Sequence, residues 1–123
     1  MKEKEYSMAN TLIGKENYEE SHLVMSRTLN YLLGQNATGY CFVTGFGTKS
    51  PEHPHHRISQ IVGKPIPGML VGGPDSSLED PYAKTVLSDR APAKCYADTD
   101  QSYSTNEVTI YWNSPLIFLL AGM

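Results

Sequence analysis

The chain has 123 residues, of which 40% are hydrophobic and 19% are charged, a balance typical of one ordinary globular domain. A formal net charge of −3 and the lack of a long basic run argue against nucleic acid and an anionic membrane as partners. The most apolar stretch, residues 110–123, is too short to cross a bilayer and is interrupted by Asn113, Ser114 and Pro115. The opening residues MKEKEYSMANTLIGKE lack the apolar segment of a secretory leader, so we expect no signal peptide in this chain.

Two helices are predicted in the first part of the chain. Residues 4–13 carry apolar side chains at helical spacing and are followed by Gly14, a common helix stop. Residues 17–33 repeat apolar positions at alternating intervals of four and three and are followed by Gly34. The face formed in this way comprises Tyr18, His22, Met25, Leu29 and Leu32. This pattern predicts a helix that packs one side on a core.

The middle of the chain is predicted to be irregular. Between Gln35 and Ser102, glycines and prolines recur every few residues and no periodic pattern survives. One exception is Asp80-Pro81, which is typical of the start of a short helix, here ending near Ser88. Connections in compact domains usually have about 4–6 residues, so we interpret this much longer region as functional.

Residues 104–121 are predicted as the last helix, apolar around most of its circumference, as in a helix buried on all sides. Ser104 and Glu107 have the spacing of a capping box at its start, a structural role that needs no chemistry. Alternatively, Glu107 lies at the mouth of an apolar helix among aromatic residues, and desolvation raises its pKa so that it stays protonated as a general acid. Spacing alone leaves both interpretations open.

The stretch GTKSPEHPHHRIS, residues 47–59, contains three of the four histidines. A metal cluster is disfavoured, because adjacent residues of an extended segment point to opposite sides and no Cys or Asp lies close by. The stretch can also be a solvated loop without a function. In the third interpretation it is a rigid binding strip, in which the prolines favour extended backbone and present His55 and Arg57 to the same side. Such a pair suits a polyhydroxylated ligand.

The two cysteines, Cys41 and Cys95, do not have CxxC spacing. A disulfide, a buried thiol pair and two unrelated thiols are therefore all compatible with the sequence. Because cysteine is among the residue types most often buried, we expect plain buried thiols.

Two segments together resemble the paired signatures of glycoside hydrolase family 9, the endo-β-1,4-glucanases also called cellulase family E. In VTGFGTKSPEHPHHR the matching positions are Val43, Thr44, Gly47, Lys49, Pro54, His55 and Arg57. In YADTDQSYSTNEVTIYWNS they are Tyr96, Asp98, Tyr103, Glu107, Thr109, Asn113 and Ser114. Cys41 departs from the family, where Ser, Thr or Val is usual. The segments LNYLLGQNATG and LVGGPD are also similar to the family, so the likeness covers nearly the whole chain.

The resemblance implies a role for each of these site residues. Glu107 would be the catalytic acid, and Asp98 the family's other active-site carboxylate in this segment. His55, a third catalytic residue by this resemblance, and Arg57 would hydrogen-bond sugar hydroxyls near the scissile bond, with Tyr103 as a further substrate contact. Family members invert the anomeric carbon, which requires a second carboxylate that activates water. No metal ion and no cofactor are expected.

The chain departs from the family in the aspartates that activate this water. The family's water-activating aspartates lie upstream in an Asp-x-x-Asp type motif, and no such motif occurs among the five aspartates of this chain. The family fold is an (α/α)6 barrel, whose twelve helices of about 11 residues would need roughly 130 helical residues. We therefore expect residues 1–123 to be the C-terminal fragment of a single catalytic domain, all-α with long active-site loops, and inactive when isolated.

The expected function is hydrolysis of internal β-1,4-glucosidic bonds of cellulose or related β-glucans, with inversion. The missing N-terminal part would supply the aspartate that activates water. One alternative is an exo-acting relative, a cellobiohydrolase or glucosaminidase, and another is a non-catalytic glucan-binding remnant. The expected partners are a β-glucan polysaccharide and the N-terminal remainder of the domain, with no nucleic acid and no membrane. By resemblance the protein would be extracellular.

Overall fold

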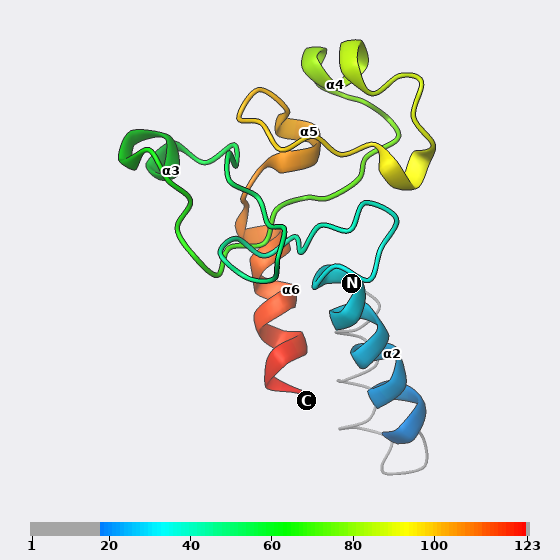
Figure 1. Ribbon diagram of the computed structural model, residues 1–123. Coiled ribbons are helices and arrows are strands. Elements are labelled where there is room, and N and C mark those ends of the chain that lie inside the picture. Colours follow the sequence, from blue (N-terminus) through cyan, green and yellow to red (C-terminus); the bar gives the residue numbers. More distant parts are fainter. Residues whose placement is uncertain (1–17, 123) are drawn as a thin grey trace.

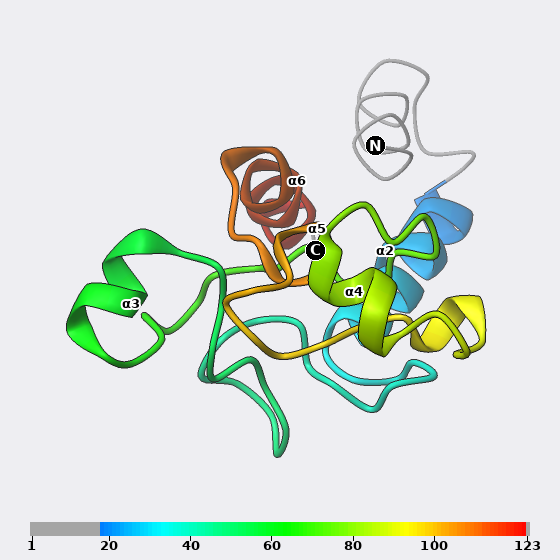
Figure 2. The same cartoon turned by 90° about the horizontal axis from the view of Figure 1, so that it is seen from above.

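The computed structural model describes residues 18–122. The helices are α2 (Tyr18–Leu32), α3 (Arg57–Val62), α4 (Pro81–Val86), α5 (Tyr103–Asn106), α6 (Ile110–Ala121) and the 3₁₀ helix η2 (Pro92–Lys94). The two long helices, α2 and α6, run side by side at one end of the molecule, and the short helices and loops form a wider end (Figure 1). Seen from above, α5 lies between α3 and α4 (Figure 2). The helix predicted over residues 4–13 lies outside the described residues.

Helix α2 confirms the helix predicted over residues 17–33. Met25 is 4% exposed, and Leu29 and Leu32 pack against the core, as the apolar spacing predicts. The helix is followed by Gly34 with φ 115°, a backbone conformation that a residue with a side chain rarely adopts. The chain therefore leaves the helix where the sequence predicts.

The middle region is largely irregular, as expected, and contains three short helical segments. In α4, the Asp80 side chain accepts a hydrogen bond from the Ala83 N–H at 2.6 Å, which confirms the predicted cap. The helix α3 was not predicted, because its six residues are too few to show a period. It is capped by His56, so the extended backbone expected to continue through Arg57 ends one residue earlier.

The prediction of one continuous helix over residues 104–121 is wrong. The chain forms α5, then an extended break at Glu107–Thr109, then α6. Val108 pairs with Val71 in this break, and the β-branched Thr109 caps α6 by accepting from the Trp112 N–H at 3.4 Å. The capping box is not formed either, because Ser104 lies inside α5 and donates its hydroxyl to Asp80 at 2.6 Å.

Helix α6 was also expected to be buried on all sides. In the chain as described it buries Leu116 and Leu119, whereas Ile110 is 77% exposed and Ile117 is 68% exposed. Its place is fixed by the Asn113 amide, which accepts from the Leu70 N–H at 2.9 Å and donates to the Leu70 carbonyl at 3.1 Å. One face of α6 is thus anchored on the loops, and the other is apolar and open.

Three isolated β-bridges hold the loops together. Residues 18–122 contain no β-strand beyond these single-residue bridges. They are the antiparallel bridges Val43↔Leu70 and Val71↔Val108 and the parallel bridge His55↔Glu107. The core behind them is composed of Cys41, Phe42, Val43, Leu70, Val71, Tyr96 and Leu116. The all-α class is confirmed, and none of the described helices is long and apolar enough to cross a membrane.

The cysteines lie in or beside this core as two free, buried thiols, as expected. A side chain at Gly47 would bring its Cβ within 2.9 Å of the Cβ of Cys41, and Gly47 itself has φ 73°. Both the contact and the backbone conformation therefore require glycine at this position of the first signature segment.

Candidate active site

The parallel bridge between His55 and Glu107 brings the two signature segments together. The His55 N–H donates to the Asn106 carbonyl at 2.9 Å, and the Val108 N–H donates to the His55 carbonyl at 3.5 Å. Two segments that are about fifty residues apart in sequence thus lie side by side with His55 next to Glu107. The break between α5 and α6 makes this pairing possible, because Glu107 has extended backbone there.

The His55 ring is held by two contacts. Its Nδ1 lies within hydrogen-bonding distance of the Asp100 backbone carbonyl, and its ring packs edge-on against that of Tyr103 with centroids 6.0 Å apart. Because a carbonyl can only accept, Nδ1 must carry the proton. The Nε2 atom of the neutral ring is then an acceptor, and it becomes a donor in the protonated ring.

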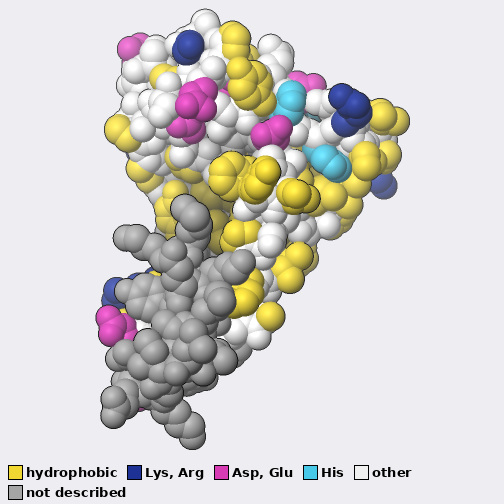
Figure 3. All heavy atoms as spheres, turned by 180° about the vertical axis from the view of Figure 1, so that it is seen from behind, with side chains coloured by type: hydrophobic (Ala, Val, Ile, Leu, Met, Phe, Trp, Pro, Cys, Tyr) yellow, Lys and Arg dark blue, Asp and Glu magenta, His cyan; other side chains and the backbone are white. Residues whose placement is uncertain are grey.

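Glu107 itself is half-buried, and no side chain or backbone group of residues 18–122 hydrogen-bonds to its carboxyl group. Two aromatic residues close to it in sequence, Tyr103 and Trp112, are 45% and 44% exposed. Figure 3 shows histidine, acidic and hydrophobic side chains close together on one face of the wider end. A half-buried carboxyl group without a hydrogen-bond partner is available to a ligand.

Asp98 differs from Glu107, because its carboxylate binds the backbone of the histidine segment, residues 52–56. One oxygen accepts from the Glu52 N–H at 2.8 Å, and the other accepts from the His53 N–H at 2.9 Å and the Asn106 amide at 3.2 Å. These donors fix Asp98 as an anchor for residues 52–53, next to the pair formed by His55 and Glu107.

Arg57, which is also a predicted site residue, and His56 lie at the start of α3. Arg57 is the first residue of that helix and is exposed. The His56 ring accepts from the Ser59 N–H at 3.4 Å and lies 2.9 Å from the Ser59 hydroxyl, so it is a helix cap. Within the described part of the chain, no group of three or more His, Cys, Asp or Glu residues could hold a metal ion.

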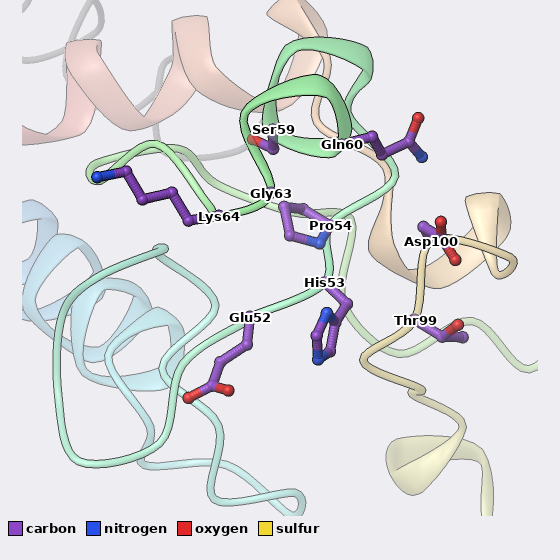
Figure 4. A pocket seen from close by; sticks show the side chains of 9 residues that line it. All are labelled: Glu52, His53, Pro54, Ser59, Gln60, Gly63, Lys64, Thr99 and Asp100. Atoms are coloured by element: carbon purple, nitrogen blue, oxygen red, sulfur yellow. The ribbon is translucent and has the colours of Figure 1, made fainter.

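A polar hollow of about 390 Å³ adjoins the histidine segment. Figure 4 shows the side chains that line it, from residues 52–54, from α3 with the turn that follows, and from Thr99 and Asp100. Asp100 links the hollow to the site, since its carbonyl oxygen contacts the His55 ring.

Sequence reasoning missed two residues that position this site. Asn106 is fully buried and joins the two signature segments, and buried Asp80 holds the start of α5. An asparagine directly before Glu107 is a weak signal, because the two groups that it binds on the other signature segment, in His53 and His55, lie more than fifty residues away. Asp80 was predicted as a cap of α4, but no pattern indicates its contacts with α5.

Burial and charge act on three buried or half-buried groups around the site. Burial raises the pKa of Tyr96, and burial followed by the charges of Asp98 and Glu52 raises that of Tyr40. Both phenols are therefore hydrogen-bond donors at ordinary pH. Burial alone would raise the pKa of Asp80, but its hydrogen bonds outweigh burial and hold that pKa below its usual value.

Comparison with known proteins decides the family. A family model described as glycosyl hydrolase family 9 matches residues 5–120. The chain belongs to this family. The segment is 48% identical over 99 residues to a xyloglucan-specific endo-beta-1,4-glucanase of Bacteroides ovatus, covering 79% of this chain and 16% of that protein. It is 42% identical over 116 residues to a cellodextrinase of Butyrivibrio fibrisolvens, covering 92% of this chain and 21% of the relative.

Solved structures agree with this assignment. An endoglucanase from Alicyclobacillus acidocaldarius superimposes with a TM-score of 0.77 at 48% identity, covering 82% of this chain and 20% of that one. A second family 9 endoglucanase, J30, gives a TM-score of 0.80 at 35% identity, covering 94% of this chain and 21% of that one. The chain thus spans about a fifth of the length of these relatives and is a segment of the family's (α/α)6 barrel, as expected.

Proposed function

We propose that this segment carries the acid side of a glycosidase active site that hydrolyses β-1,4-glucosidic bonds of cellulose or related β-glucans. Glu107 donates the proton to the leaving glycosidic oxygen, because its carboxyl group is unengaged and its backbone is paired with that of His55. His55 and Arg57 hydrogen-bond sugar hydroxyls, and Tyr103 packs against the His55 ring and offers its exposed face to the sugar. The observation that carries the proposal is the bridge between His55 and Glu107.

The water-activating carboxylate comes from outside this segment in the proposed enzyme. Inversion requires two carboxyl groups about 6.5–9.5 Å apart on opposite faces of the sugar, with water between the base and the anomeric carbon. The Asp98 carboxylate is occupied by backbone and amide donors, which supports a role beside the acid and not as the base. Residues 1–123 are then the C-terminal part of one catalytic domain, and its N-terminal remainder supplies the base.

An exo-acting enzyme is a second candidate, because the names of the relatives include more than endoglucanases. A cellulose 1,4-beta-cellobiosidase of Acetivibrio thermocellus is 40% identical over 103 residues, covering 79% of this chain and 12% of that protein. The loops outside this segment would decide between internal and terminal cleavage. An extracellular location is part of the proposal, since an insoluble polymer must be degraded outside the cell.

The proposed function is tested on a complete domain that contains this segment. The domain is incubated with carboxymethylcellulose, and both reducing ends and viscosity are followed. We expect reducing ends to appear together with a steep fall in viscosity, which indicates internal cleavage. Release of reducing ends without loss of viscosity would favour the exo-acting alternative. A folded domain with no release above a Glu107→Gln control would contradict the glycosidase proposal.

A further inference from the structure

We propose that Asn106 is a positioning residue, which sets the place of His55 relative to Glu107. The inference rests on the glycosidase function proposed above. Asn106 is the last residue of α5, directly precedes Glu107 in the chain and has an exposed fraction of 0%. A buried amide is costly unless its polar atoms are paired, so its partners indicate what it does.

Two of its contacts hold the histidine segment at a fixed register. The backbone carbonyl of Asn106 accepts from the His55 N–H at 2.9 Å, and its side-chain Nδ2 donates to the His53 carbonyl at 2.8 Å. One residue therefore binds two backbone groups that lie two positions apart on an extended segment. A slip of one residue in such a segment turns each side chain to the opposite face. These two bonds thus keep the His55 ring on its observed face, beside Glu107.

The other contacts connect Asn106 to the segment that carries Asp98. Its Nδ2 lies 3.2 Å from an Asp98 carboxylate oxygen and 3.3 Å from the Thr99 carbonyl, and its Oδ1 accepts from the Tyr96 hydroxyl at 2.7 Å. Burial raises the pKa of Tyr96, so that its hydroxyl stays a donor. Asp98 in turn binds the His53 N–H at 2.9 Å. The same loop is thereby held from two sides.

Only an amide fits this set of partners. The site requires a donor toward the His53 carbonyl and the Asp98 carboxylate, and an acceptor toward the Tyr96 hydroxyl. An aspartate at position 106 keeps the acceptor but loses the donor. It also places a second carboxylate beside Asp98, and like charges at this separation repel. We therefore expect Asn106→Asp to move residues 53–55 relative to Glu107.

The test compares two substrates in a complete domain that carries Asn106→Asp. Cellotetraose has a poor leaving group, which must be protonated by the acid. The dinitrophenolate group of dinitrophenyl β-cellobioside leaves without protonation. In the proposed function His55 binds the sugar, so a change in its place relative to Glu107 moves the acid away from the glycosidic oxygen. We expect kcat on cellotetraose to fall about 10- to 100-fold more than kcat on the dinitrophenyl substrate, because only cellotetraose needs the proton from the acid. The control is Tyr96→Phe, which removes one hydrogen bond but leaves both bonds to the histidine segment. Its ratio of the two rates should equal that of the unchanged domain.

The outcomes separate positioning from a merely structural role. A loss of folded protein lowers both rates by the same factor, so an unchanged ratio in a folded variant overturns the inference. Where Asn106→Asp does not fold, Asn106→Ser is measured in the same way, since serine is small and adds no charge. The proposed function has its own control in Glu107→Gln. If that variant retains full activity on cellotetraose, the function fails whatever Asn106 does.

Discussion

Replacing Asp80 with Ala should loosen α4 and α5 together, although the two helices are separated by some twenty residues of sequence. The buried Asp80 carboxylate accepts from the Ala83 N–H at 2.6 Å at the start of α4. Its other oxygen accepts from the Ser104 N–H at 3.1 Å, the Ser104 hydroxyl at 2.6 Å and the Ser102 hydroxyl at 2.8 Å. One side chain thus caps one helix and holds the start of the next.

The expected cost follows from these contacts. Loss of the cap at Ala83 costs about 1 kcal/mol. The Ser104 N–H loses its acceptor in a part-buried position, which costs about 1–3 kcal/mol. The Ser102 hydroxyl is spared, because it also lies 2.8 Å from the Thr105 hydroxyl. The sum is about 2–4 kcal/mol, which is a factor of about 30 to 1,000 in the equilibrium for local opening.

The assay is hydrogen exchange read by mass spectrometry on the complete domain, over the peptides that contain α4 and α5. This readout is local and does not require reversible unfolding of a large protein. The control is Asp89→Ala, which removes the same side chain from an exposed position. Faster exchange in α4 alone would show that Asp80 does not couple the helices, and unchanged exchange in both would refute the reasoning entirely.

Three further predictions concern pH, binding and the isolated chain. Because the folded pKa of Asp80 is lowered, its ionised form stabilises the fold above the unfolded pKa of about 3.9, and this contribution is lost as pH falls through the folded value. The difference in melting temperature between the unchanged domain and Asp80→Asn should therefore shrink below about pH 4. A difference that grows below this pH would contradict the prediction. His55→Ala and Arg57→Ala should each raise KM for cellotetraose and lower kcat, and unchanged kinetics would contradict their role in sugar binding. The purified 123-residue chain should associate and bind a hydrophobic dye, because Ile110 and Ile117 of α6 are largely exposed, whereas a dye-free monomer in size-exclusion chromatography would contradict this.

The elements that the sequence predicts correctly are those whose signals are local. Helix α2 follows from a repeated apolar face, and α4 follows from the adjacent pair Asp80-Pro81. Both patterns act within a few residues of chain, where helix propensity and capping decide the structure.

The break before α6 could not be predicted, because its cause is not local. Residues 104–121 are apolar enough for one helix, yet Val108 pairs with Val71 and Glu107 pairs with His55. These partners lie 37 and 52 positions away in the chain, so no window around Glu107 contains them. Tertiary pairing overrides the local preference at this point, and it does so where the site lies.

The residues of the candidate site also fall into two groups, those that the sequence indicates and those that only the structure shows. His55, Arg57, Asp98, Tyr103 and Glu107 are indicated by the two signature segments, through their resemblance to a family. Asn106 and the α5 contacts of Asp80 are visible only in the structure, since a buried amide and a buried carboxylate acquire their roles from partners elsewhere in the chain.

The central claim is that Glu107 is the proton donor, and the leaving-group dependence of Glu107→Gln tests it most directly. No hydrogen bond of the described structure depends on the Glu107 side chain, and the capping box is not formed, so the substitution should leave stability unchanged. In the complete domain we expect kcat on cellotetraose to fall at least about a hundredfold, whereas kcat on dinitrophenyl β-cellobioside should stay within about threefold of the unchanged domain. Equal losses on both substrates, or near-normal hydrolysis of cellotetraose by the folded variant, would contradict the account.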